Sequence, residues 1–102
     1  MAIDVRIWEQ TGRLLMPDTF DFKVHRDFNN AYMPLLENAA IREIEIEMSK
    51  VEFIDSSALG MLMLLNERAK MANKTIVLSN VSSMALKLLE VANFRKIFNF
   101  KP

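Results

Sequence analysis

The sequence has no cysteine and little glycine, proline or histidine: two, three and one residue respectively among 102. Without cysteine, disulfides and thiolate metal sites are excluded. Hydrophobic residues make up 51% of the chain, and this content with so few glycines and prolines excludes a disordered chain and a loop-rich scaffold. A length of 102 residues predicts one domain, spanning residues 1–102.

The chain also lacks an excess of charge of either sign. Lysine and arginine number 13 and aspartate and glutamate also number 13, so the positive excess needed to bind a nucleic-acid backbone is missing. No apolar run approaches the roughly 18 residues of a membrane span, and the first residues lack the pattern of a secretory signal. We therefore expect a cytoplasmic protein that binds neither nucleic acid nor membrane.

The parts of common catalytic sites are missing too. There is no glycine-rich phosphate loop, and the single histidine, His25, is better interpreted as a capping or solvated residue than as a general base. Glu43, Glu45 and Glu47 alternate along a strand, about 7 Å apart and without the convergence of a metal site, so we expect a solvated or salt-bridged strand face. The sequence predicts no catalytic residue, no metal and no cofactor.

Alternation of apolar and polar residues predicts the first strands. It predicts a strand over 3–7 and a short one over 14–16, joined by a tight turn at 10–13 into an N-terminal hairpin. Residues 41–48 alternate most strictly, with isoleucine and methionine on one side and the three glutamates on the other. They predict a further strand.

Apolar residues at intervals of three and four predict helices. One is expected from Val24 with Asp21 as its N-cap, and Pro34 should end or kink it near Met33. Residues 58–71 contain no proline or β-branched residue and follow a capping Asp-Ser-Ser triplet, so they predict a second helix.

The rest of the chain continues this alternation of strand and helix. We expect a strand over 75–78, followed by a helix with Ser82 or Ser83 as its N-cap. This helix should end at Asn93, and a last strand is expected over 96–100. The whole order predicts an α/β fold with a mixed, mostly parallel sheet, an N-terminal β-hairpin and about three helices.

The stretch Val51–Gly60 contains the most informative residues. An apolar run is followed by Asp55, Ser56 and Ser57, which open a helix where free backbone N–H groups and the positive end of the helix dipole gather. A phosphate on a hydroxyl there would add about −1.5 to −2 charges at a helix end that accepts them. Helix capping alone also explains the triplet.

The predicted helix over 58–71 has two contrasting faces, at about 100° per residue. The residues expected to face the sheet are Ala58, Leu62, Leu65, Ala69 and Ala72, flanked by Leu59 and Met61. Those on the opposite face are Ser56, Gly60, Met63, Leu64, Glu67 and Met71. Polar residues normally occupy such a face, so its apolar side chains predict a partner-binding patch; burial under the N-terminal strand or a homodimer contact is the alternative.

Residues 51–60 resemble the signature of STAS domains, specifically of bacterial anti-sigma-factor antagonists. The family pattern is an apolar pair followed by Asp-Ser-Ser/Thr-Gly-Leu-Gly, and the residues that match it are Asp55, Ser56, Ser57, Leu59 and Gly60. Ala58 replaces the first glycine. The order of elements agrees over nearly the whole chain, so the resemblance implies a single STAS-like domain.

A second family element, Gly-x-apolar-Asp, resembles residues 18–21. Asp21 matches its aspartate, whereas Asp18 stands where glycine is usual, as Asn93 does at the end of the third helix. The resemblance implies that Ser56 is the phosphorylated hydroxyl and that Asp21 lies near it. The implied partner-binding residues are Asp21, Asp55, Ser57, Gly60, Met63 and Leu64.

The resemblance implies a partner-switching regulator that is not an enzyme. Unphosphorylated, it would bind an anti-sigma factor of the GHKL serine kinase class and release a sigma factor; phosphorylation at Ser56 would abolish binding, and a metal-dependent serine phosphatase would restore it. The alternative is a STAS module that senses a small ligand or docks on a biofilm or second-messenger enzyme. A sequence ending at Pro102 lacks the last helix of many relatives, which leaves a sheet edge or face less covered and allows a weak homodimer.

Overall fold

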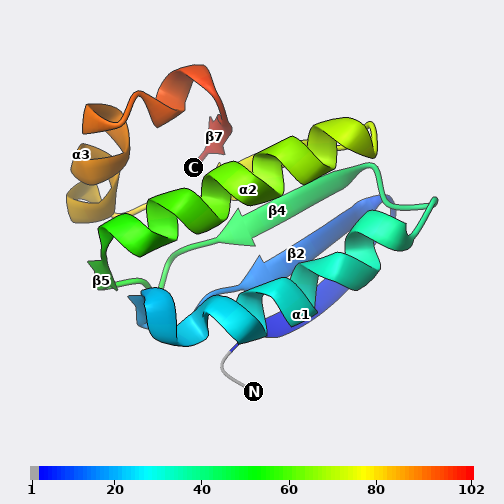
Figure 1. Ribbon diagram of the computed structural model, residues 1–102, viewed down its shortest axis with the longest axis horizontal. Helices are drawn as coiled ribbons and strands as arrows, with labels where there is room; N and C mark the ends of the chain where they lie inside the picture. The colour runs from blue at the N-terminus through cyan, green and yellow to red at the C-terminus, as the bar shows by residue number, and fades with distance from the viewer. Residues whose placement is uncertain (1–2) are drawn as a thin grey trace.

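The computed structural model describes residues 3–102, in which five strands form the main sheet in the order β1-β2-β4-β6-β7 (Figure 1). Their bounds are Asp4–Trp8, Thr11–Leu15, Glu43–Glu47, Thr75–Ser79 and Asn99–Lys101 in that order. β1 and β2 form an antiparallel hairpin, and every other neighbouring pair of this sheet is parallel. The predicted mixed, mostly parallel sheet is confirmed.

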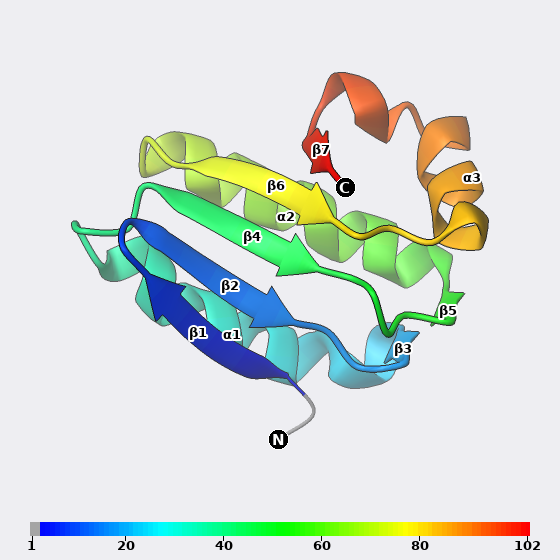
Figure 2. The same cartoon turned by 180° about the vertical axis from the view of Figure 1, so that it is seen from behind.

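Two long helices cover one face of the sheet. They are α1, His25–Glu37, preceded by a short 3-10 turn η1, Phe22–Val24, and α2, Ser56–Met71. A third helix, α3, Ser83–Val91, and a 3-10 turn η2, Phe94–Lys96, connect β6 to β7. Seen from behind, β1, β2, β4 and β6 have no helix in front of them, so the other face of the sheet is open (Figure 2).

Strand β4 has an apolar and an acidic side, as its alternation predicts. Ile44 and Ile46 are fully buried beneath the helices. Glu45, on the open face, is also buried, because Arg13 and Lys101 approach its carboxylate at 3.2 and 3.5 Å and the Ser79 hydroxyl donates to it at 2.6 Å. At Glu45 the glutamate face is therefore salt-bridged rather than solvated.

The hairpin turn lies earlier in the chain than predicted. Glu9 and Gln10 form it, with Glu9 at φ 54°, and residues 11–13 belong to β2 instead. Gly12 was predicted to lie in the turn. Its actual role is close packing, because a Cβ at this position would lie 2.6 Å from the Leu35 side chain of α1.

Helix α1 does not end at Pro34 but continues to Glu37. Proline removes the hydrogen bond to the carbonyl of Asn30, but both residues are exposed, so water can bond that carbonyl instead. The buried side chain of Leu35 anchors the turn that follows. Asp21, expected as the N-cap of this helix, caps η1 instead: its side chain accepts from the Lys23 N–H at 3.0 Å. Helix α1 follows Val24 without a side-chain cap.

The C-terminal part follows the prediction up to Asn93. Ser82 caps α3 by accepting from the Ala85 N–H, and Asn93 has the left-handed conformation, φ 62°, just beyond the helix end. The last strand was predicted over 96–100 and is wrong in its first half. Phe94 and Phe98 pack together at 5.2 Å across a helical turn, which keeps both rings buried, and the strand begins only at Asn99.

Candidate functional site

A second sheet of two short strands builds one end of the molecule. β3, Thr19–Phe20, pairs in parallel with β5, Phe53–Ile54, and Phe20 lies opposite Ile54. Because parallel strands end at the same edge, the residues that follow, Asp21 and Asp55, lie next to each other. Residues more than 30 positions apart in the sequence are thus brought together, in agreement with the expectation that Asp21 lies near Ser56.

Each of these two aspartates begins a helical segment. Asp21 caps η1, and the Asp55 carboxylate accepts from the Ala58 N–H of α2 at 3.2 Å. Asp55 alone is therefore the N-cap, and Ser56 is the first residue of the helix rather than a capping residue. Since Asp55 makes the capping bond, the hydroxyl of Ser56 is not needed for it.

Ser56 is exposed, whereas Ser57 is half-buried. A group attached to the Ser56 oxygen would lie at the first turn of a 16-residue helix, where the N–H groups of the first residues point outward. An anion is favoured there by about 0.3–1 kcal/mol at an exposed site. The hydroxyl of Ser56 is accordingly accessible.

The predicted sheet-facing side of α2 is confirmed at four positions. Ala58, Leu62, Leu65 and Ala69 are fully buried, whereas Ala72, at the helix end, is only half-buried. The flanking Met61 is buried and Leu59 half-buried. Asn66 is buried as well, and the sequence analysis did not identify it.

The opposite side of α2 is less uniform than predicted. Gly60 and Leu64 are exposed, the latter to 42%, but Met63 is half-buried and packs against the core, so its placement on the solvent side was wrong. Met63 lies one turn from Leu59 and Asn66, which are half-buried and buried, so the buried side of α2 extends further around the helix than predicted. Met71 is exposed but lies four turns from Ser56, at the far end of α2.

Gly60 lies one turn beyond Ser56 and has nothing around it. A Cβ built on it would meet no atom within 4 Å. Glycine in a helix interior costs about 1 kcal/mol relative to alanine. Nothing within residues 3–102 therefore requires glycine at this position, and the helix would be more stable without it.

Two exposed aromatic side chains at this end were not predicted from the sequence. Phe22 follows Asp21 and is 71% exposed, and Phe53 precedes Asp55 by two residues and is 52% exposed. Alternation with the buried Ile54 could have identified Phe53, but β5 has only two residues. Phe22 lies in η1, outside the strand, and strand alternation with the buried Phe20 would have placed it on the buried side. Together with Leu64 they add apolar surface to the end of the molecule that carries Ser56.

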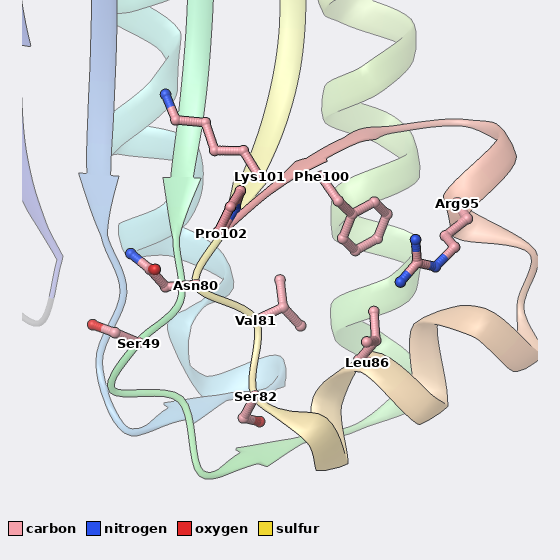
Figure 3. Close-up of a pocket in the computed structure, with 9 residues that line it drawn as sticks. All are labelled: Ser49, Asn80, Val81, Ser82, Leu86, Arg95, Phe100, Lys101 and Pro102. Carbon is pink, nitrogen blue, oxygen red and sulfur yellow. The ribbon is translucent and has the colours of Figure 1, made fainter.

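A cavity of about 630 Å³ lies elsewhere, where β6 and β7 end (Figure 3). Arg95 and Phe100 lie side by side at one end of it, with the Arg95 guanidinium 5.5 Å from the ring centre, and Ser49 and Asn80 lie at the other. None of the predicted partner-binding residues lines it. Among the described helices, none is long and apolar enough to cross a bilayer.

Comparison with solved structures finds the same fold in anti-sigma factor antagonists. An anti-sigma-factor antagonist (STAS) domain protein from Planctomyces limnophilus superposes with a TM-score of 0.85 at 19% identity, over 97% of this chain and 88% of that one. SpoIIAA in its unphosphorylated form gives 0.75 at 14%, over 99% and 87% of the two chains. SpoIIAA of Bacillus in its phosphorylated form also superposes with a TM-score of 0.75. Identities this low show the fold.

Sequence comparison shows the family. Residues 3–99 match the STAS family described as "Mlab, STAS domain". A STAS-domain containing protein of Pseudomonas aeruginosa is 41% identical over 81 residues, which are 78% of this chain and 76% of that protein. With a match over nearly its whole length, the chain belongs to the STAS domain family.

Proposed function

We propose that this chain is a phosphorylation-switched regulator of the anti-sigma-factor-antagonist type. The observation that carries the proposal is an exposed hydroxyl, Ser56, at the first position of a rigid helix whose cap is made by another residue, Asp55. Such a hydroxyl can gain a phosphate without loss of the helix. The existence of the same fold in both an unphosphorylated and a phosphorylated form of SpoIIAA supports the proposal.

The surface around Ser56 has the composition of a partner-binding site. Leu64, Phe22 and Phe53 are exposed and apolar, and aromatic residues are enriched in protein interfaces. Gly60 lets a partner's backbone approach α2 closely, which gives a reason for a glycine that the chain itself does not need. We assign Ser57 and Met63 to the edge of this surface, since both are half-buried.

The phosphate would act on the complex and not on the fold of the regulator. A partner surface shaped for a neutral hydroxyl would have to remove water from a group of about −1.5 to −2 charges. Asp21 and Asp55 lie beside Ser56 and add negative charge to the same region, which disfavours any acidic group on the partner. Unphosphorylated, the chain binds; phosphorylated, it dissociates.

The partners we propose are those of the partner-switching cycle. An anti-sigma factor with a GHKL-type serine kinase fold binds the unmodified chain, releases its sigma factor and transfers phosphate to Ser56 in the cytoplasm. A metal-dependent serine phosphatase removes the phosphate. ATP and metal ions belong to these partners, and the chain itself catalyses no reaction.

Capture of partners with three variants tests the proposal. Ser56→Ala should retain the kinase from a lysate of the source organism, Ser56→Asp should lose it, and Ser57→Ala should behave like the unmodified chain and still accept phosphate. Intact mass and site mapping after incubation with ATP and the captured kinase identify the modified residue. Phosphate on Ser57, or a captured enzyme of another class with no kinase among the bound proteins, would contradict the assignment.

A further inference from the structure

Strand β1 is an unprotected edge of the main sheet. All five of its residues are exposed, including Val5 to 41% and Ile7 to 57% on the side of the sheet that the helices cover. Edge strands are normally blocked by charged side chains, lysine above all, or by proline, a bulge or a covering element. β1 has no lysine or proline, its two charged residues, Asp4 and Arg6, are of opposite sign, and it pairs with β2 over five consecutive residues without a bulge.

The hairpin register shows which backbone groups of β1 are free. In an antiparallel pair, hydrogen-bonded and non-hydrogen-bonded residue pairs alternate, and the pair that flanks a two-residue loop is hydrogen-bonded. Trp8 and Thr11 flank the loop Glu9–Gln10, so Trp8, Arg6 and Asp4 bond to β2. The N–H and C=O groups of Val5 and Ile7 therefore point away from the sheet.

A second β1 strand can pair with this edge by two-fold symmetry in few registers. A register centred on Arg6 would place two guanidinium groups directly opposite each other, which is destabilising. A register centred on Ile7 would draw the turn residues Glu9 and Gln10 into the pairing, and the φ of 54° at Glu9 turns the chain away from a strand.

The register centred on Val5 has neither fault. It places Val5 opposite Val5 of the second copy as a hydrogen-bonded pair. Asp4 then lies opposite Arg6 of the second copy, and by symmetry Arg6 lies opposite Asp4 of the second copy, at the closer spacing of non-hydrogen-bonded pairs. Among the ion pairs within residues 3–102, none involves Asp4 or Arg6, so both charges are available for this contact.

The geometry points to a symmetric homodimer in which two β1 strands pair antiparallel about Val5, joined by two Asp4–Arg6 ion pairs. The five-stranded sheet then continues into the second copy across the dimer axis. Val5 and Ile7 of both copies form one apolar layer on the helix side. Ser56 follows β5 at the start of α2, away from the β1 edge, so both copies keep their partner-binding surfaces free (Figure 2).

Charge exchange between the two positions tests the register. We measure the dimer dissociation constant of the full chain by sedimentation velocity, over micromolar to millimolar concentrations. Arg6→Asp and Asp4→Arg alone should each raise this constant about tenfold or more, because both ion pairs become like-charge contacts. The double variant, with both substitutions, should restore it. Lys87→Asp, the same change of charge on an exposed residue of α3, is the control and should leave it unchanged.

A second variant tests the backbone bonds independently. Val5→Pro removes an N–H that points away from β2, so it should abolish the dimer while circular dichroism shows an intact fold. A chain that is monomeric at all concentrations would overturn the inference. Failure of the double variant to restore a dimer that the single variants weaken would overturn the Val5 register. Neither result depends on Ser56, so the proposed function is tested separately.

Discussion

Ser56 and Asp55 have separate tasks at the start of α2, and the separation is what permits a switch. If the Ser56 oxygen made the capping bond, a phosphate attached to that oxygen would disturb the bond and change the helix terminus. Asp55 makes the capping bond at 3.2 Å, so the neighbouring hydroxyl is free to change its charge. At the first helical position, the added charge stabilises the helix, while it weakens a complex that must exclude water from it.

Gly60 gives a prediction in which stability and binding change in opposite directions. Gly60→Ala should raise the free energy of unfolding by about 0.5–1 kcal/mol, because alanine favours the helix and its methyl group meets no atom of the chain. The same substitution should weaken binding of the captured kinase, since the methyl group occupies the space of the partner's backbone. Urea unfolding and a binding titration measure the two effects.

Gly60→Leu extends this test with a larger side chain. It should unfold at no lower urea concentration than the unmodified chain and should bind the kinase more weakly than Gly60→Ala. If both variants bind as tightly as the unmodified chain, the partner does not approach α2 at this position.

Glu47 predicts how stability depends on pH. Burial by itself would raise the pKa of Glu47, but hydrogen bonds from the Asn80 amide at 2.6 Å and from the Ser49 hydroxyl and N–H at 2.9 and 3.2 Å outweigh it, and the positive charge of Arg13 adds to them. The pKa of Glu47 is therefore lowered in the folded chain. A lowered pKa stabilises the fold at pH values above the unfolded-state pKa of about 4.5. This stabilisation is lost as the pH falls through the pKa that Glu47 has in the folded chain.

Glu47→Gln should accordingly be less stable than the unmodified chain at pH 7, and the difference should shrink as the pH falls below about 4.5. Urea midpoints measured across this range give the comparison. Glu67→Gln, the same substitution on the exposed side of α2, is the control. A Glu47→Gln difference that stays constant with pH would mean that the carboxylate is not held by these bonds.

At the scale of elements, α2 has one face in the core and, in the proposed function, one face for the partner. Leu62→Ala and Leu65→Ala should each destabilise the chain by roughly 2–5 kcal/mol, because both side chains are fully buried.

Leu64→Asp should leave the urea midpoint nearly unchanged and abolish kinase binding, because Leu64 is exposed beside Gly60. Met63→Asp should lower stability, since Met63 packs against the core. A large fall in stability of Leu64→Asp would place Leu64 in the core instead.

The elements with strong periodicity could be predicted from the sequence, and the short ones could not. β4 and α2 follow from strict alternation and from an uninterrupted apolar stripe, so their buried apolar residues were identified. The buried polar residues Glu45, Glu47 and Asn66 were not, because their burial depends on contacts with other segments. β3 and β5 have two residues each, too few for any period to be visible, and they exist because Thr19–Phe20 and Phe53–Ile54 pair with each other. Gly12 was misinterpreted because its packing against Leu35 is a contact between distant segments.

At the scale of the whole molecule, the site depends on pairing between distant segments. The triplet Asp55, Ser56 and Ser57 is visible in the sequence, but only the β3–β5 pairing sets Asp21 beside it and exposes Phe22 and Phe53 at the same end. The sheet has helices on one face, an open second face and a free β1 edge (Figure 2). The proposed partner-binding end and the proposed edge for a second copy are therefore separate parts of the molecule.

The affinity of the chain for its kinase, before and after phosphorylation of Ser56, tests the central claim most directly. Calorimetric titration should be made with a kinase preparation that cannot transfer phosphate, so that the state of Ser56 is fixed. We predict that the Ser56-phosphorylated chain binds roughly a hundredfold more weakly, a loss of about 2.7 kcal/mol, with an unchanged circular dichroism spectrum. Equal affinities for the two forms would contradict the account.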